Sequence, residues 1–413
     1  MSKNVLFVTW DGPQVNYLES LFAPIFEKLK AQGFQFHVVQ FTWAESEQIA
    51  RSYNICKERG IPYRSVKILR WPSISVGSVV SVIRSKHILL KAIKDWNIDI
   101  LMPRATLPAW AVERANKQLQ LPVVFDSDGL PIDEKVEFEG LNVSSFTHRL
   151  LRDIEFRVLH KSVAVMVRSN DAAIILRERG GAALDPSKFF VVGNGRDPSV
   201  FVAGIEGGDS ILKKSLGLND AAPIIAYVGS LGGKYRFDQV LQFFLRLRLK
   251  LPNVQLLVLT PGPDLAWEAI GHLSDDDANS CVVRHVAGSE VPRYLSFVDL
   301  GLVFIEPSYS MRAVAPVKLG EYLLCGLPVV ATTKNIGDSA SYIESDFGFA
   351  IDYVDEAALD SASEWFSSLL SSEKLPLARK KAREAGMEHF SIESVLDAYS
   401  DCLAAVSSRS IEK

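Results

Sequence analysis

The residues of this chain that are best placed for chemistry are Lys318 and Glu321, in the segment 315–332, which reads APVKLGEYLLCGLPVVAT. Pro316 suits the first turn of a helix, Gly326 suits its end, and an apolar run of strand length follows. The start of a helix presents unpaired N–H groups and the positive end of the helix dipole, which together favour a phosphate or diphosphate. The segment therefore predicts an anion site at a helix start.

Lys318 and Glu321 are predicted to bind different parts of a ligand. A cation in the first turn of a helix is unfavourable unless an anion lies nearby, so Lys318 favours a bound diphosphate. The carboxylate of Glu321, one turn later, can accept two hydrogen bonds from a ribose diol. The alternative is a plain surface ion pair between these i and i+3 residues. Gly320 favours the ligand site, because glycine inside a helix is costly and usually marks a close approach.

A second anion-binding candidate is the glycine-rich loop 229–234, which reads GSLGGK. It follows a strand-like run and precedes a helical pattern, so it could wrap a phosphate with Lys234. It is not a P-loop, because the glycine spacing is one residue short and Tyr235 replaces the Ser or Thr that holds magnesium. Arg236 favours anion binding, whereas a flexible loop with a solvated lysine is the alternative.

Acidic residues gather after a buried strand in the first half of the chain, where the sequence FDSDG is followed by Asp133 and Glu134. Asp126 and Asp128 could orient sugar hydroxyls or accept a proton. Asp133 and Glu134 could instead cap the following helix. Arg104, which follows another strand, is a candidate for binding an anion or pairing with a carboxylate.

Two further patterns complete the candidate chemistry. Gly12 follows the first strand and leaves room for the backbone to approach a ligand, although one glycine turn is weak evidence. The seven histidines form no metal-ligand motif, and no serine-hydrolase motif occurs. We therefore expect no metal and no cofactor.

Strand-like runs alternate with helical patterns along the chain, which indicates parallel sheets covered by helices. The runs fall into two series, at 5–8, 36–41, 63–69, 98–102, 123–125, 163–167 and 189–192, and at 224–228, 254–259, 282–285, 300–305, 329–331 and 349–351. With 413 residues, two domains are expected. We predict an α/β chain with two doubly wound, Rossmann-like domains facing across a cleft, at 1–198, completed by a helix at 391–413, and at 199–390.

The charge distribution limits the partners. The net charge of −4 argues against nucleic acid. Between Arg59 and Lys94 stand eight basic residues and no acidic one, interleaved with Trp71 and an apolar run. This mixture fits an anionic membrane surface or a polyanionic acceptor, or else a solvated helix face. The four cysteines show no close pairing, and neither a leader nor a membrane span is visible, so we expect a cytoplasmic protein, peripheral at the inner membrane face.

With these residues in place, the chain resembles the retaining GT-B nucleotide-sugar glycosyltransferases of family 4 over essentially its whole length. The segment PVKLGEYLLCGLPVVAT is the most specific part. The resemblance extends to VFDSDGLPIDE at 124–134, IEFRVLHKSVAVMVRSN at 154–170, VVGNGRD at 191–197 and YVGSLGGKY at 227–235, and to the turn containing Arg104.

The resemblance implies a role for each donor-side residue. Glu321 would bind the ribose of the donor nucleotide, the backbone near Pro316 and Val317 would hold the diphosphate, and Lys234 would neutralise it as it leaves. The remaining donor-side positions are Gly12, Gly229, Ser230, Arg236, Lys318, His285 and Val286, the last two in the loop that would meet the base. On the acceptor side, Asp126 would take the position where many relatives have a histidine, with Arg104, Asp128 and Asp133 around it.

Three departures from the family pattern stand out. Ala313 replaces the first acid of the common Glu-x7-Glu pattern, so the contacts to the donor sugar and the identity of that sugar stay open. Ser230 replaces the arginine of the glycine-rich loop, which leaves Lys234, with Arg236, to neutralise the diphosphate. Asp128 stands where related subgroups carry an arginine, which points to unusual acceptor recognition.

The resemblance implies a metal-independent retaining glycosyltransferase. It would move a sugar from a nucleoside-diphosphate sugar to a glycan or lipid-linked saccharide in bacterial surface or exopolysaccharide synthesis. Two alternatives stay open at this stage. A nucleotide-sugar epimerase can share the scaffold, and a non-catalytic nucleotide-sugar-binding protein would be consistent with Ala313.

Overall fold

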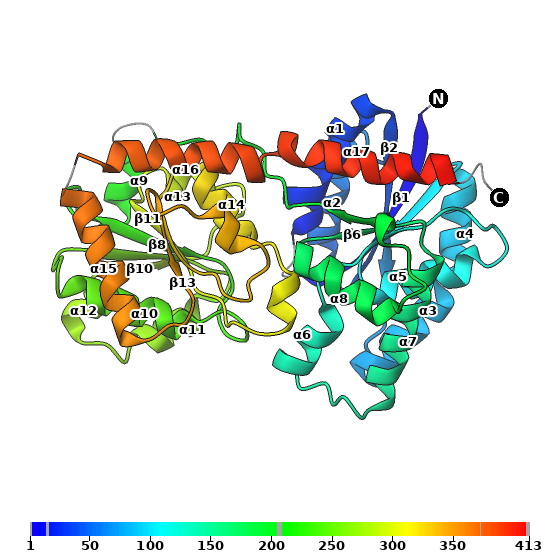
Figure 1. Ribbon diagram of the computed structural model, residues 1–413, viewed down its shortest axis with the longest axis horizontal. Helices are drawn as coiled ribbons and strands as arrows, with labels where there is room; N and C mark the ends of the chain where they lie inside the picture. Colours follow the sequence, from blue (N-terminus) through cyan, green and yellow to red (C-terminus); the bar gives the residue numbers. More distant parts are fainter. Residues whose placement is uncertain (1, 14–15, 205–208, 372, 410–413) are drawn as a thin grey trace. The chain divides into compact units, whose positions relative to one another are not determined.

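The computed structural model describes residues 2–13, 16–204, 209–371 and 373–409. The chain divides into two compact units (Figure 1), one formed by Met1–Gly193 with Val395–Lys413 and the other by Asn194–Ser394. The sequence pattern places these boundaries at residues 198 and 390, within five residues of the boundaries in the structure. Among the helices of the described segments, none combines the length and the apolar character needed to cross a membrane.

The first unit is built on parallel strands in the order β3-β2-β1-β4 and β5-β6-β7. Isolated parallel bridges, Leu101 to Val123 and Arg104 to Asp126, join β4 to β5. The chain therefore reverses its direction of sheet growth between β1 and β4, where ligands of such sheets bind. The strands are β1 (Lys3–Asp11), β2 (Phe34–Thr42), β3 (Tyr63–Lys67), β4 (Ile100–Pro103), β5 (Val124–Asp126), β6 (Ala164–Val167) and β7 (Phe189–Val191).

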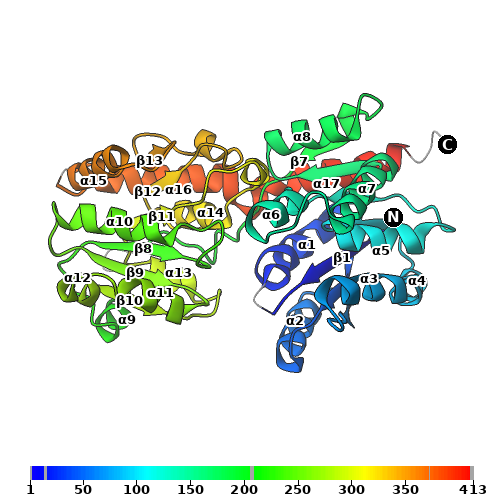
Figure 2. The same ribbon diagram turned by 90° about the horizontal axis from the view of Figure 1, so that it is seen from below.

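Helices cover both faces of this sheet (Figure 2), and its inner strands β4, β5 and β6 are buried throughout. On one face Phe26 stacks on Phe36, with ring centroids 3.9 Å apart. The helices are α1 (Ala23–Leu29), α2 (Ser46–Glu58), α3 (Ile74–Arg84), α4 (Lys86–Asp95), α5 (Thr106–Asn116), α6 (Pro131–Phe138), α7 (Phe146–Lys161), α8 (Asn170–Gly180) and most of α17 (Ile392–Arg409), with short helices η1 (Leu18–Phe22), η2 (Lys30–Gln32) and η3 (Pro186–Lys188).

The second unit holds one six-stranded parallel sheet in the order β10-β9-β8-β11-β12-β13. Its direction of growth reverses between β8 and β11, so the loops after these two strands flank the predicted ligand crevice. The strands are β8 (Ile224–Val228), β9 (Gln255–Leu259), β10 (Cys281–Arg284), β11 (Leu300–Val303), β12 (Val329–Thr332) and β13 (Gly348–Ile351). Each strand-like run expected from the sequence overlaps one of the strands β1 to β13.

Helix α14, which carries the best candidate residues, packs against α16 (Figure 2). A Cβ atom on Gly320 would lie 2.5 Å from the ring of Phe390, at the end of α16. The close approach at Gly320 is therefore to a neighbouring helix, and the glycine gives no evidence of a ligand. The helices of this unit are α9 (Ser210–Ser215), α10 (Phe237–Arg248), α11 (Pro263–Ile270), α12 (Asp275–Asn279), α13 (Val291–Leu295), α14 (Val317–Leu324), α15 (Glu356–Ser371) and α16 (Leu375–Phe390), with η4 (Ser310–Ala313) and η5 (Ser339–Tyr342).

Candidate functional site

The glycine-rich loop and the start of α14 meet at the β8/β11 end of the second sheet. Gly229 directly follows β8 and has a φ of +130°, a conformation that favours glycine. A Cβ atom at this position would lie 2.9 Å from Lys318 Nζ. Gly229 thus lets the loop pass close over the lysine, and the two segments predicted to bind an anion form one site.

The amine of Lys318 is buried between two aromatic rings. Its Nζ atom lies 4.3 Å from the ring centroids of both Tyr227 and Tyr235, and it donates a hydrogen bond to Tyr227 Oη at 3.3 Å. Burial lowers the pKa of Lys318 to about 7, an effect that the charge of Glu321 opposes and that of Lys234 reinforces. An anion bound beside this amine would favour its charged form.

Glu321 lies one turn further along α14 and is paired with a residue that the sequence analysis did not identify. Its Oε1 atom accepts a hydrogen bond from Arg196 Nη2 at 2.5 Å. Both side chains are largely buried, with 11% and 6% exposure for the glutamate and the arginine. The simple surface pair between Lys318 and Glu321 is therefore not the arrangement in the structure. The carboxylate retains capacity to accept further hydrogen bonds.

The charge of Arg236, beside the glycine-rich loop, is already compensated. Arg236 donates to Asp238 at 2.7 Å and also to Glu306, so its guanidinium is neutralised by two carboxylates. Lys234 lies in the loop, with Nζ 5.7 Å from the ring centroid of Tyr235. The prediction that Arg236 neutralises an incoming anion is thus not supported by its contacts. Ser230 is exposed, and its carbonyl oxygen accepts a 2.5 Å hydrogen bond from Tyr227.

Four further predicted donor-side residues, Pro316, Val317, His285 and Val286, lie in the second unit. Pro316 precedes α14 as its N-cap residue without a side-chain cap, and Val317 is the first residue of the helix. The preceding loop is held by Asn194, whose Nδ2 donates to the Ala315 carbonyl at 2.8 Å. The segment beginning at His285 and Val286 follows β10, the edge strand of the sheet.

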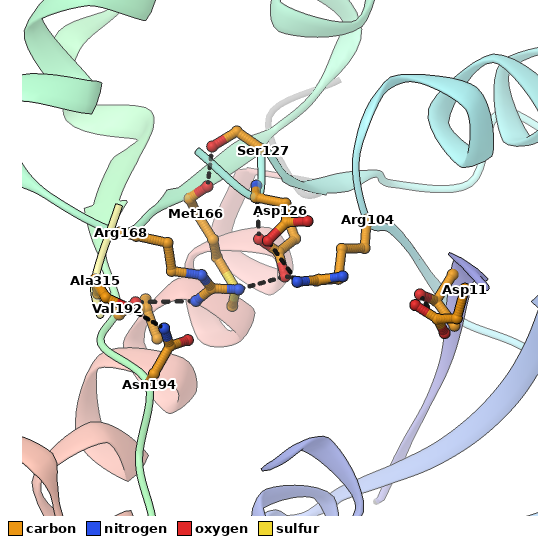
Figure 3. A network of polar contacts seen from close by, with 11 residues as sticks. Asp11, Arg104, Asp126, Ser127, Met166, Arg168, Val192, Asn194 and Ala315 are labelled. Carbon is orange, nitrogen blue, oxygen red and sulfur yellow. Dashed lines mark hydrogen bonds and ion pairs between the residues drawn. The ribbon is translucent and has the colours of Figure 1, made fainter. Parts of the chain in front are cut away.

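In the first unit, Asp126 is the centre of a buried ion-pair network (Figure 3). It is fully buried, and its Oδ2 accepts a hydrogen bond from Arg168 Nη2 at 2.5 Å, with Arg104 Nε 3.9 Å away. Arg168 also donates to the Val192 carbonyl at 2.9 Å. These contacts correct the expectation that Asp126 contacts a substrate, because its carboxylate is already enclosed by two guanidinium groups.

Asp128 is the more accessible carboxylate of this pair of aspartates. Its side chain is 32% exposed and pairs with Arg104, and its backbone has a φ of +53°. Burial raises the pKa of Asp128 to about 6, against the effect of Arg104 and together with that of Asp126. Asp128, whose side chain is partly exposed, can therefore exchange a proton with a bound group near neutral pH.

Two other predicted residues have structural roles instead. Asp133 accepts hydrogen bonds from Arg152 at 2.6 Å and from Arg179 at 2.9 Å, which tie α6 to α7 and α8. A Cβ atom on Gly12 would lie 2.7 Å from the ring of Trp43. The glycine therefore makes room for an indole ring, which corrects the expectation that it makes room for a ligand.

Asp11 was missed, although it ends β1 at the point where the first sheet changes direction. Its Oδ2 accepts hydrogen bonds from Gln40 at 2.9 Å and Thr9 at 3.0 Å. Burial raises its pKa, and Arg104 opposes this shift. Its place at the end of the first strand was the signal that could have identified it.

Part of the chain matches a known protein family. Residues 222–365 match the family described as glycosyl transferases group 1. The matched stretch is similar to a glycosyltransferase group 1 domain. It contains the glycine-rich loop, Lys318 and Glu321, whereas Arg196 lies outside it.

The chain is also similar, at low sequence identity, to a known protein. The chain is 24% identical, over 194 residues, to TuaH of Bacillus subtilis, a candidate teichuronic acid biosynthesis glycosyltransferase. The match covers 46% of this chain and 45% of TuaH, so the chain spans about half the length of this relative.

Solved structures extend the likeness of the fold beyond the group 1 domain. A glycosyltransferase from Rickettsia africae has a TM-score of 0.71 at 16% identity, covering 97% of this chain and 99% of its own. Anabaena HepE in complex with UDP-glucose has a TM-score of 0.71 at 14% identity, with the same coverage. The chain shares with both neighbours an α/β fold with two parallel-sheet units, the GT-B fold.

Proposed function

We propose that this chain is a metal-independent retaining glycosyltransferase. It transfers a sugar from a nucleoside-diphosphate sugar to a glycan or lipid-linked saccharide in bacterial surface or exopolysaccharide synthesis. The observation that carries the proposal is the convergence of Lys318, the loop of Lys234 and the start of α14. The group 1 domain, the UDP-glucose complex of HepE and the name of TuaH support it.

The arrangement suits a reaction in which a diphosphate leaves. As the bond between the anomeric carbon and the diphosphate oxygen breaks, negative charge grows on the departing group. Lys234, Lys318 and the N–H groups at the start of α14 are cationic or dipolar groups fixed in advance, which stabilise such charge without reorganisation. Glu321 accepts hydrogen bonds from the ribose. On the acceptor side, Asp128 and Arg104 are the polar groups that would bind the attacking saccharide.

The test is a thermal-shift and turnover screen over nucleoside-diphosphate sugars, with free UDP and GDP as controls. We expect one nucleotide to stabilise the wild-type protein and Glu321→Ala to lose that stabilisation. Lys380, whose side chain is 72% exposed on α16, supplies the matched control Lys380→Ala, which should behave as wild type. A protein that no nucleotide stabilises would contradict the proposed donor site.

Ala313 favours a second candidate function. This residue is fully buried in η4, where the family pattern has an acid, so it contributes no carboxylate to the site. A non-catalytic nucleotide-sugar-binding protein would show this feature. The same screen separates the two functions, because a binding protein would be stabilised by its nucleotide sugar and would neither hydrolyse nor transfer it with any saccharide acceptor.

We also propose that the first unit contacts an anionic membrane from the cytoplasmic side. The connection from β3 to α3 exposes Trp71 at 85%, and the first turn of α3 exposes Ile74 and Val76 at 60% and 47%. Lys67 and Arg70 are exposed in the same stretch. Exposed apolar side chains beside basic ones fit the interface of a membrane with anionic lipids.

Sedimentation with phosphatidylglycerol-containing vesicles tests this contact. We expect binding at low salt that weakens at high salt and in Trp71→Ala. Phe146, which is 73% exposed at the start of α7, supplies the matched control Phe146→Ala. Equal loss of binding in both variants, or no binding at low salt, would contradict a membrane contact through this segment.

A further inference from the structure

Arg196 contacts helix α14, which carries Glu321, and also the segment 390–392. The chain passes between its two units twice, just before Arg196 and just after residue 392. Arg196 lies just after the crossing at Gly193. Its N–H donates to the carbonyl of Phe390 at 2.7 Å, and its own carbonyl accepts from Ile392 N–H at 2.9 Å, just before the chain returns to the first unit. Its side chain reaches Glu321 in α14. Its backbone is therefore held in place independently of the ion pair.

The ion pair between Arg196 and Glu321 keeps Glu321 from pairing with Lys318. Glu321 lies at i+3 from Lys318, a spacing at which the two could pair directly. In the structure, Arg196 holds Glu321 Oε1, while the Lys318 amine lies between Tyr227 and Tyr235. The guanidinium is itself held over the ring of Phe201, 4.8 Å from its centroid. Arg196 thereby fixes Glu321 and leaves the lysine amine for another anion.

We propose that Arg196 is a positioning residue of the nucleotide site, one that makes the site selective for a ribonucleotide. By holding one oxygen of Glu321, it directs the other oxygen to the ribose hydroxyls. A carboxylate that is fixed in this way distinguishes a ribose from a 2′-deoxyribose, because the deoxy sugar leaves a buried acceptor without its hydrogen bond. This inference rests on the proposed function, in which Glu321 binds the ribose.

The experiment compares the affinities of UDP and 2′-deoxy-UDP for wild type, Arg196→Met and Arg196→Lys by calorimetry. We expect wild type to prefer UDP by about 10- to 100-fold, the contribution of a hydrogen bond to a charged group. Arg196→Met, which keeps much of the side-chain volume, should lose most of that preference. Arg196→Lys should keep part of it, because it retains the charge without the forked geometry.

A double-mutant cycle distinguishes positioning from a structural role. Glu321→Gln should lose the same preference, and adding Arg196→Met to it should cause little further loss, because the two residues act through one contact. If Arg196→Met and Arg196→Lys weaken both nucleotides by one factor and leave their ratio unchanged, Arg196 has only a structural role. If wild type binds neither nucleotide, the proposed function fails, and this inference fails with it.

Discussion

Replacing Lys318 by methionine should stabilise the protein while removing its affinity for a diphosphate. The pKa of Lys318 falls from 10.5 to about 7 on burial, which makes the charged form unfavourable in the folded state. At pH 7 this difference amounts to a cost of ~4 kcal/mol. Methionine fills a similar volume and packs well against aromatic rings such as Tyr227 and Tyr235. We therefore expect the free energy of unfolding of Lys318→Met to exceed that of wild type by about 1–4 kcal/mol at pH 7.

The pH dependence of stability makes this prediction specific. Between pH 7 and 10.5 the unfolded chain holds the Lys318 proton and the folded chain does not, so the wild-type free energy of unfolding rises with pH. Relative to Lys318→Met, wild type should gain about 2 kcal/mol between pH 7 and pH 9. Urea denaturation of both proteins across this range measures the difference. Parallel pH profiles would refute the reasoning, because they would mean that the lysine keeps its ordinary pKa.

The other predictions concern residues whose roles the structure separates. Lys234→Ala should lower turnover by about 10²- to 10³-fold without changing the melting temperature, and near-normal turnover would contradict its role beside the leaving group. Asp126→Asn should destabilise the fold by about 3–5 kcal/mol in chemical denaturation, because it leaves Arg168 buried without its carboxylate. An unchanged midpoint would contradict that network. Gly320→Ala should cost about 1–3 kcal/mol through its clash with Phe390. The variant should keep its nucleotide affinity. If it lost that affinity while keeping the wild-type stability, Gly320 would belong to the ligand site.

Sequence reasoning was most successful where a feature depends on local backbone conformation. The alternation of apolar runs predicted the two parallel-sheet units, because strands buried on both faces must be apolar throughout. The predicted glycosyltransferase character is confirmed at the level of the group 1 domain and of the fold. The glycine-rich loop and the α14 start could be recognised because turn and cap residues are read within a few positions. Family 4, the retaining mechanism and the roles of the site residues stay predictions.

The tertiary structure alone decided which side chains pair and which face solvent. Arg196 and Glu321 stand 125 positions apart, and their ion pair follows from the packing of the crossing segment against α14. Asp126 and Asp128 stand two positions apart, yet one is enclosed by arginines and the other is partly exposed. The reason is that β5 ends at Asp126, whereas Asp128 lies in the turn that follows, with a φ of +53°. A local pattern specifies the backbone that carries a residue. Its partners and its pKa depend on the burial and charges that distant segments bring to it.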